Sequence, residues 1–251
     1  MKAPVLLITP PFTQLNTPYP ATAYLKGFLN TRGIVSVQAD LGIEVTLQLF
    51  SGSGLRQLFQ TIESSGAGVS ANARRILSLK DAYIDSIDEA IAFLQGRRPT
   101  LAHRIARREF LPEASRFAQL DDLHWAFGTM GTQDKAKHLA TLYLEDLSDL
   151  IQETLDPHFG FSRYAESLAR SANSFDELYN ALQQPISYVD QILIGLLQQR
   201  IEEVGPELLA LSVPFPGNLY TSLRCAQWIR QHKPGITVAM GGGFANTELR
   251  S

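Results

Sequence analysis

The feature that most constrains the fold is a short apolar run near the N-terminus, residues 4–9, which shows no polar alternation. Such a run is typical of a strand that is covered on both faces, and this favours a parallel sheet. Pro10 and Pro11 end the strand, because neither proline can donate a backbone hydrogen bond to a neighbouring strand. The sequence therefore predicts a buried parallel strand followed directly by a loop.

A helix and a second strand follow. After a polar loop at residues 12–20, apolar side chains recur at helical spacing, and Gly33 suits the left-handed cap that closes a helix. Residues 34–39 are rich in β-branched side chains and predict the second strand. Together these segments make one β-α-β unit with a right-handed crossover. The helix stripe consists of Ala21, Tyr24, Leu25, Phe28 and Leu29.

The same pattern returns near the C-terminus. Residues 208–213 form a strand of the buried type, residues 214–218 form a loop, and residues 236–240 form a fourth strand that runs into three glycines. Between the loop and the fourth strand lies a helix, whose apolar stripe is Leu219, Leu223, Ala226 and Ile229.

The middle of the chain, about residues 43–204, has no convincing strand pattern and has high helix propensity. We therefore expect an all-helical insertion at 43–204 between strands two and three. Residues 1–42 and 205–251 form an α/β domain with a Rossmann- or flavodoxin-like, mostly parallel sheet of about four strands. The helical patterns fall at residues 82–94, 101–108, 137–154, 161–171, 175–182 and 186–197.

Three loops leave the carboxyl ends of the predicted strands, where open parallel sheets bind their ligands. These loops, residues 9–19, 212–218 and 241–246, carry no charged side chain. Their composition suits backbone and amide contacts to a large, mostly neutral ligand or to phosphates. The candidate binding residues are Pro11, Thr13, Gln14, Asn16, Ser212, Val213, Pro214, Gly241, Gly242 and Gly243.

Each part of this candidate site has a plainer alternative. Gly241, Gly242 and Gly243 allow either the close approach of a ligand or a tight turn between strand and loop. Thr13, Gln14 and Asn16 are suited to hydrogen bonds with a cofactor or to capping of the loop and the next helix. Neither the G-x-G-x-x-G fingerprint nor the phosphate-loop motif of nucleotide hydrolases occurs.

The remaining composition excludes several classes of function. The net charge of −3 gives no general affinity for nucleic acid or for an anionic membrane. One cysteine, Cys225, makes neither an intrachain disulfide nor a cysteine-only metal site, and the five histidines lack metal-ligand spacing. The first apolar run is too short for a signal peptide or a membrane span, so we expect a cytoplasmic protein. No catalytic group and no metal ligand is predicted.

The two ends of the chain resemble the N-terminal domain of cobalamin-binding radical S-adenosylmethionine proteins. The resemblance rests on Pro10-Pro11, Ala23-Tyr24-Leu25, Leu211-Ser212-Val213, Trp228-Ile229-Arg230 and Gly241-Gly242-Gly243. It implies a cobalamin-binding fold in which Ser212 contacts the nucleotide loop of the cofactor and the glycines let that tail lie on the sheet edge. The helical middle matches no family that we can name.

Two departures from that family qualify what the resemblance implies. The D-x-H-x-x-G motif is absent, so cobalamin would lack a histidine lower ligand. The C-x-x-x-C-x-x-C motif is absent too, and one cysteine cannot hold the iron–sulfur cluster. The cluster, S-adenosylmethionine and the radical chemistry are therefore expected in a C-terminal domain beyond Ser251, which would be the partner of this chain. The chain itself is expected to be a truncated fragment and no complete enzyme.

Three hypotheses remain at the level of the sequence. The first is a cobalamin-binding module of a radical enzyme that acts in methyl transfer or rearrangement. The second is a scaffold that keeps the fold, binds no ligand, and docks the catalytic barrel or a partner through its helical insertion. The third is a response-regulator-like or other small-ligand Rossmann domain, and the lack of an acidic cluster after the first strand argues against a phosphoacceptor.

Overall fold

The computed structural model describes residues 4–13, 19–66, 68–118, 131–161 and 175–247. The chain divides into two compact units. Met1–Thr46 and His158–Ser251 form the first, which we call the α/β unit, and Leu47–Pro157 form the second, the helical unit. This division differs from the expected boundaries, because residues 158–204 lie with the sheet and the helical unit is correspondingly shorter than 43–204.

The α/β unit is built on a four-stranded sheet in the order β2-β1-β3-β4. The strands are β1 (Val5–Thr9), β2 (Ser36–Asp40), β3 (Leu208–Ser212) and β4 (Thr237–Gly241). Every neighbouring pair is parallel. The order matches the first four strands of a flavodoxin-like sheet, so the predicted α/β fold class is confirmed.

The register aligns the carboxyl ends of the strands. Thr9 at the end of β1 pairs with Asp40 at the end of β2. Ser212 at the end of β3 likewise pairs with Gly241 at the end of β4. Since chain order reverses direction between β1 and β3, the point between these two strands is the switch point at which such sheets bind ligands.

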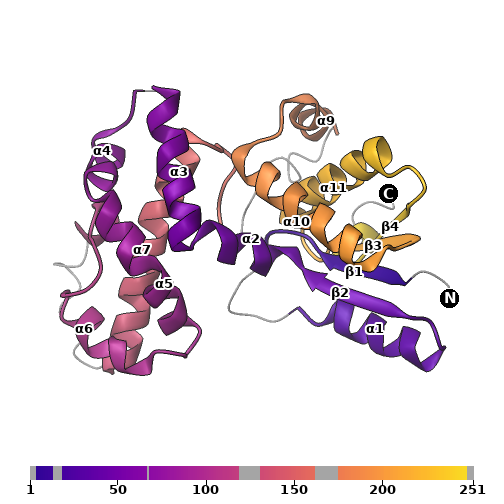
Figure 1. Cartoon of the computed structure of the whole chain (residues 1–251), viewed down its shortest axis with the longest axis horizontal. Helices are drawn as coiled ribbons and strands as arrows, with labels where there is room; N and C mark the ends of the chain where they lie inside the picture. The colour runs from indigo at the N-terminus through magenta and orange to yellow at the C-terminus, as the bar shows by residue number, and fades with distance from the viewer. Residues whose placement is uncertain (1–3, 14–18, 67, 119–130, 162–174, 248–251) are drawn as a thin grey trace. The chain divides into compact units, whose positions relative to one another are not determined.

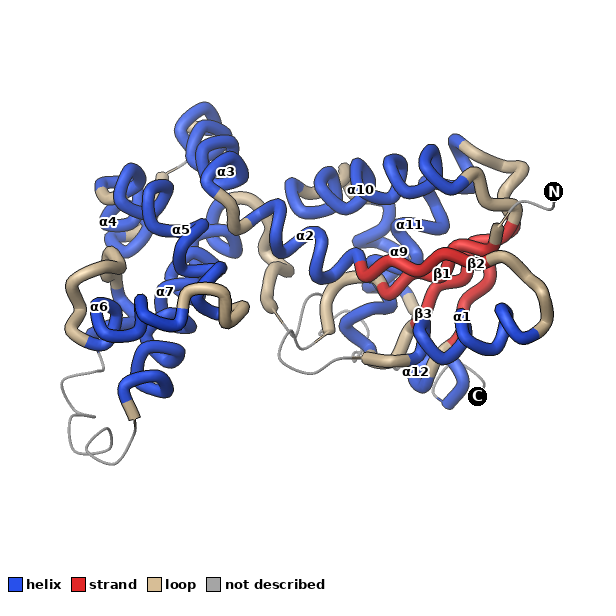
Figure 2. The backbone as a smooth tube through the Cα atoms, turned by 60° about the horizontal axis from the view of Figure 1, so that its bottom comes forward, coloured by secondary structure: helices blue, strands red, loops and turns tan. Residues whose placement is uncertain are grey.

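Helices cover the two faces of the sheet unequally. Figures 1 and 2 show α10 (Tyr188–Val204) and α11 (Leu219–His232) on one face, and α1 (Ala21–Thr31) on the other. Helix α10 begins with a capping box between Ser187 and Asp190 and ends at Gly205, whose φ of 58° lies in the left-handed region. The predicted cap at Gly33 is also confirmed, with φ of 67°.

Helix α10 packs within the α/β unit through contacts between residues that are distant in sequence. Asp190 on α10 forms a buried ion pair with Arg224 on α11, and Arg200 binds Glu44 of α2 (Leu41–Leu49). Arg224 also donates to the carbonyl of Leu182 on α9 (Asp176–Gln183). These contacts hold α9 and α10 against α11. Two short elements, η4 (Pro216–Asn218) and α12 (Gly243–Thr247), follow β3 and β4.

The described part of the helical unit contains helices and no strand (Figure 2). Serines cap two of them, since Ser51 accepts from Gly54 N and Ser70 from Ala73 N. Tyr83 and Tyr143 stack in the core with ring centroids 5.1 Å apart. The expected helix at 161–171 lies almost wholly outside the described residues. The elements are α3 (Gly52–Ser65), α4 (Ala71–Ser78), α5 (Lys80–Leu94), η1 (Pro99–Leu101), α6 (Ala102–Ala106) and α7 (Thr132–Thr154).

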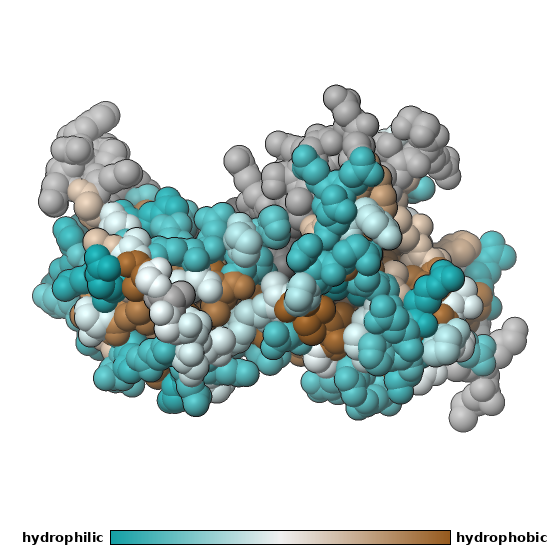
Figure 3. Space-filling model, turned by 90° about the horizontal axis from the view of Figure 1, so that it is seen from above, coloured by the Kyte–Doolittle hydropathy of each residue, from teal (hydrophilic) through white to brown (hydrophobic). Residues whose placement is uncertain are grey.

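The surface is mixed in character. In the view from above, most of the surface of the described residues is hydrophilic, with smaller apolar patches between the hydrophilic regions (Figure 3). Among the described helices, none is both long enough and apolar enough to cross a membrane.

Candidate functional site

Two of the three predicted loops meet directly at the carboxyl ends of β3 and β4. Val213 N donates to Gly241 O at 2.7 Å, and Phe244 N donates back to Val213 O at 3.2 Å. These bonds continue the pairing of the two strands into their loops. The glycines and the segment Ser212–Pro214 therefore lie side by side, as the parallel sheet predicts.

The loop after β1 is tied to the same region through the start of α11. The side-chain amide of Asn218 donates to Pro10 O at 2.8 Å, and the hydroxyl of Thr221 donates to Pro11 O at 2.5 Å. Both side chains are buried. The three loops thus share one rim of the sheet, which we call the switch-point rim: residues 9–13, 212–218 and 241–244.

The predicted site residues differ widely in their accessibility on this rim. Five of the eight described ones are buried, Gly241 and Gly242 are half-buried, and Gly243 is exposed. Gln14 and Asn16 lie outside the described residues. The buried ones are Pro11, Thr13, Ser212, Val213 and Pro214. A ligand would therefore meet Gly243 first, then the half-buried Gly241 and Gly242, and would reach the five buried residues only if the rim opened.

The three glycines do different things. Gly242 has φ of 115°, and a Cβ atom there would lie 2.5 Å from Val213 O, so only glycine fits this turn. A Cβ atom at Gly241 would meet nothing within 4 Å, and one at Gly243 would lie 3.4 Å from Pro214 O. The tight turn between strand and loop accounts for Gly242, while Gly243 leaves open backbone beside Pro214.

The rim is neutral, and two of its buried oxygen atoms have no hydrogen-bond partner within the described ranges. These are Thr9 Oγ1 and Asn218 Oδ1, which flank the switch point between β1 and β3. Buried acceptors without a donor are uncommon, because each one costs free energy. Thr9 and Asn218 are both buried, so a ligand would reach these atoms only if the rim opened.

One charged group close to the rim is Asp40, at the end of β2. Burial raises the pKa of its carboxyl, and one of its oxygens accepts a hydrogen bond from Ile43 N at 3.0 Å. A Cβ atom at Gly42 would lie 3.2 Å from the same carboxylate and 3.5 Å from Pro11 Cα. Asp40 therefore fixes the start of α2 beside the rim.

Sequence reasoning missed the residues that close the rim. Asn218 and Thr221 look like ordinary residues at the start of a helix, and only their pairing with the Pro10 and Pro11 carbonyls reveals their role. Phe215 was missed as well, although its position between two prolines was a usable signal. Cys225 is buried, and burial raises the pKa of its thiol, in agreement with a packing residue.

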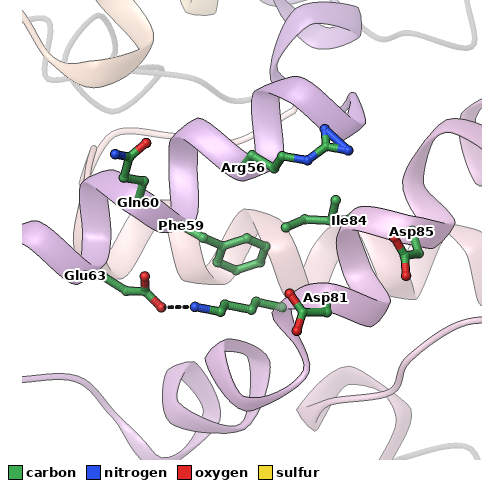
Figure 4. Close-up of a pocket in the computed structure, with 8 residues that line it drawn as sticks. Arg56, Phe59, Gln60, Glu63, Asp81, Ile84 and Asp85 are labelled. Carbon is green, nitrogen blue, oxygen red and sulfur yellow. Dashed lines mark hydrogen bonds and ion pairs between the residues drawn. The ribbon is translucent and has the colours of Figure 1, made fainter.

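A pocket lies on the helical unit, between α3 and α5 (Figure 4). Its charged groups include the ion pair between Lys80 Nζ and Glu63 Oε1 at 2.5 Å, which raises the pKa of Lys80. Such an exposed, ion-paired groove is typical of a solvated helix face. The described residues of the whole chain contain no group of three or more histidine, cysteine or carboxylate side chains that could hold a metal.

Comparison of the chain with protein-family models, with curated proteins and with solved structures finds no match.

Proposed function

We propose that the α/β unit is a cobalamin-binding module of a radical S-adenosylmethionine enzyme whose iron–sulfur chemistry is carried by residues outside this chain. The observation that carries the proposal is the meeting of three uncharged loops at the switch-point rim. This is the position at which open parallel sheets bind large ligands.

The residues at the rim fit the periphery of cobalamin, which is neutral and rich in amides. Gly243 offers exposed backbone, and Thr9 Oγ1 and Asn218 Oδ1, which have no hydrogen-bond partner in the described structure, would become available where the rim opens. No histidine follows β1, so these residues would hold the cofactor by its periphery and leave its lower face without a histidine ligand. When bound, cobalamin supplies a cobalt–carbon bond for methyl transfer or rearrangement.

The test is a titration of the whole chain with hydroxocobalamin, followed by visible spectroscopy and gel filtration. We expect a shift of the visible bands and co-elution of cobalamin with the protein. Valine at Gly243 fills open backbone at the rim, and Gly243→Val should weaken binding about tenfold, the effect of overpacking a site by 1–3 kcal/mol.

Gly235→Val is the matched control for this variant. Gly235 lies in the same unit, just before the other end of β4, and a Cβ atom there meets nothing within 4 Å. Its affinity should equal that of the unaltered chain. Absence of any spectral change and of co-elution at high micromolar cobalamin would refute the proposal.

One specific observation favours a second candidate, a ligand-free scaffold that docks a catalytic domain or another partner. Ser212, Val213 and Pro214 are buried, and the side chains of Asn218 and Thr221 already occupy the carbonyls of Pro10 and Pro11. A closed rim of this kind needs no ligand for its stability. The cobalamin titration separates the two candidates, because a scaffold binds no cobalamin.

A further inference from the structure

One large apolar side chain stands out from the closed rim. Phe215 is 52% exposed, although the rest of its loop is largely buried, including Ser212, Val213, Pro214 and Asn218. About half of this side chain therefore remains exposed to solvent in the folded chain. Its place at the carboxyl end of β3 puts it where a bound ligand would pass.

The backbone holds this ring in place. Phe215 is flanked by Pro214 and Pro216, and both prolines restrict the dihedral angles around it. Its backbone is extended, with φ of −134° and ψ of 160°, and its carbonyl accepts from Asn218 N at 3.1 Å. The ring is therefore presented by a fixed backbone, and ordering it on a ligand costs little conformational entropy.

A second aromatic ring meets it from another loop. Tyr19, in the connection between β1 and α1, packs edge-to-face against Phe215 with ring centroids 6.0 Å apart and planes at 61°. Such pairs hold each other in a defined orientation. The ring of Tyr19 thus braces that of Phe215. Gly243, on the third loop, leaves exposed backbone next to Pro214.

We infer that Tyr19 and Phe215 form an aromatic wall that stacks against a flat conjugated ring of the ligand at the switch-point rim. This inference rests on the proposed function, and it names the part of the ligand that is recognised. Two sources supply such a ring in a cobalamin: the corrin macrocycle and the heteroaromatic base of the nucleotide tail. Stacking on an aromatic face is tolerant of the identity of the ring, so either source satisfies the same geometry.

The experiment compares the whole chain with Phe215→Leu, Phe215→Trp and Tyr19→Leu by calorimetric titration. Phe215→Leu should bind hydroxocobalamin about tenfold more weakly, as expected for the loss of one stacked ring. Phe215→Trp should keep the affinity, because it keeps a flat face. Tyr19→Leu should show a smaller loss, because Tyr19 braces the ring.

Phe175→Leu is the matched control. Phe175 is 58% exposed, lies in the same unit, and pairs with Tyr179 at a centroid distance of 6.4 Å, but it belongs to none of the rim loops. Its affinity for hydroxocobalamin should be unchanged. Circular dichroism of each variant establishes that the fold is retained.

Two further probes identify the ring and separate the possible failures. Cobinamide lacks the nucleotide base, so a loss that persists with cobinamide assigns the stacking to the corrin, and a loss confined to cobalamin assigns it to the base. Cobalamin binding that is equal in Phe215→Leu and the unaltered chain overturns the inference and leaves the proposed function standing. Binding of adenosine monophosphate that depends on Phe215, without cobalamin binding, supports the aromatic wall and refutes the cobalamin module. Binding of none of the three probes refutes both.

Discussion

Arg224 Nε lies 3.0 Å from Asp190 Oδ2 in the interior of the α/β unit, where neither side chain is more than 4% exposed. The contact is an ion pair, and the guanidinium Nη groups make the hydrogen bonds, to the carbonyls of Ala181 and Leu182 and to the hydroxyl of Tyr220. Tyr220 in turn donates to Asp190 at 2.9 Å. This network fastens α9 and α10 to α11.

Breaking this pair from one side should be strongly destabilising. Arg224→Met leaves the carboxylate of Asp190 buried without its cation, and we expect a loss of about 3–5 kcal/mol in the free energy of unfolding. Arg230→Met, an exposed position on the same helix, should change it by less than about 0.5 kcal/mol. Urea denaturation followed by circular dichroism measures both. The double variant Arg224→Met with Asp190→Leu should recover part of the loss, and a simple sum of the two single effects would contradict this account.

Two neighbouring glycines of the rim, Gly242 and Gly241, supply a second prediction, in which one variant is the control for the other. Gly242→Ala places a Cβ atom 2.5 Å from Val213 O at a φ of 115°, so it should cost about 3 kcal/mol of stability through strain and overpacking. Gly241→Ala meets nothing within 4 Å and should change stability by less than about 1 kcal/mol. Thermal and urea unfolding of both variants check the contrast. Equal effects at the two positions would show that the turn does not require glycine.

The four strands were predictable from sequence because a parallel sheet needs short apolar or β-branched runs. Three of these runs end at a proline or a glycine, namely 4–9, 208–213 and 236–240. The loops that follow these strands were expected at one rim because the carboxyl ends of parallel strands lie at the same edge of a sheet. The hydrogen bonds from Val213 to Gly241 and from Asn218 to Pro10 confirm this expectation. What the pattern could not give was accessibility. The burial of Ser212 and Thr13 depends on tertiary packing, which no local pattern specifies.

The helices show the same limit. The apolar stripe of α1 predicted a helix correctly, but Tyr24 and Phe28 are 77% and 57% exposed. Periodicity identifies which residues share a face, and it does not establish that another element covers that face. The assignment of α10 to the sheet was missed for a related reason. It depends on the ion pair between Asp190 and Arg224, which lies 34 residues later in the chain.

The link between the double-proline loop and α11 supplies a third prediction. Thr221→Val removes the hydroxyl that donates to Pro11 O and leaves that buried carbonyl without this donor. We expect a loss of about 2 kcal/mol, the cost of an unsatisfied buried acceptor. Thr31→Val removes an exposed hydroxyl that bonds only within its own helix, and serves as the control with a change below about 0.5 kcal/mol. Similar changes in the free energy of unfolding for the two variants, measured by urea denaturation, would show that the hydrogen bond from Thr221 to Pro11 does not stabilise the fold.

The last prediction concerns pH and the helical unit. Asp146 on α7 is fully buried and accepts hydrogen bonds from Ala114 N and Arg116 N. Burial raises the pKa of its carboxyl to about 6, against the lowering effect of those two bonds. Because the folded-state pKa lies above the ordinary value of 3.8, the folded chain binds a proton more tightly than the unfolded chain. The stabilisation from protonated Asp146 is therefore complete below about pH 4 and is lost as the pH rises through 6.

Relative to Asp146→Asn, which cannot titrate, the unaltered chain should gain about 1 kcal/mol of stability between pH 7 and pH 5. Urea denaturation of both proteins at pH 5, 6 and 7 measures this difference, in which the other carboxylates cancel. A difference that is constant over this range would show that Asp146 does not titrate there.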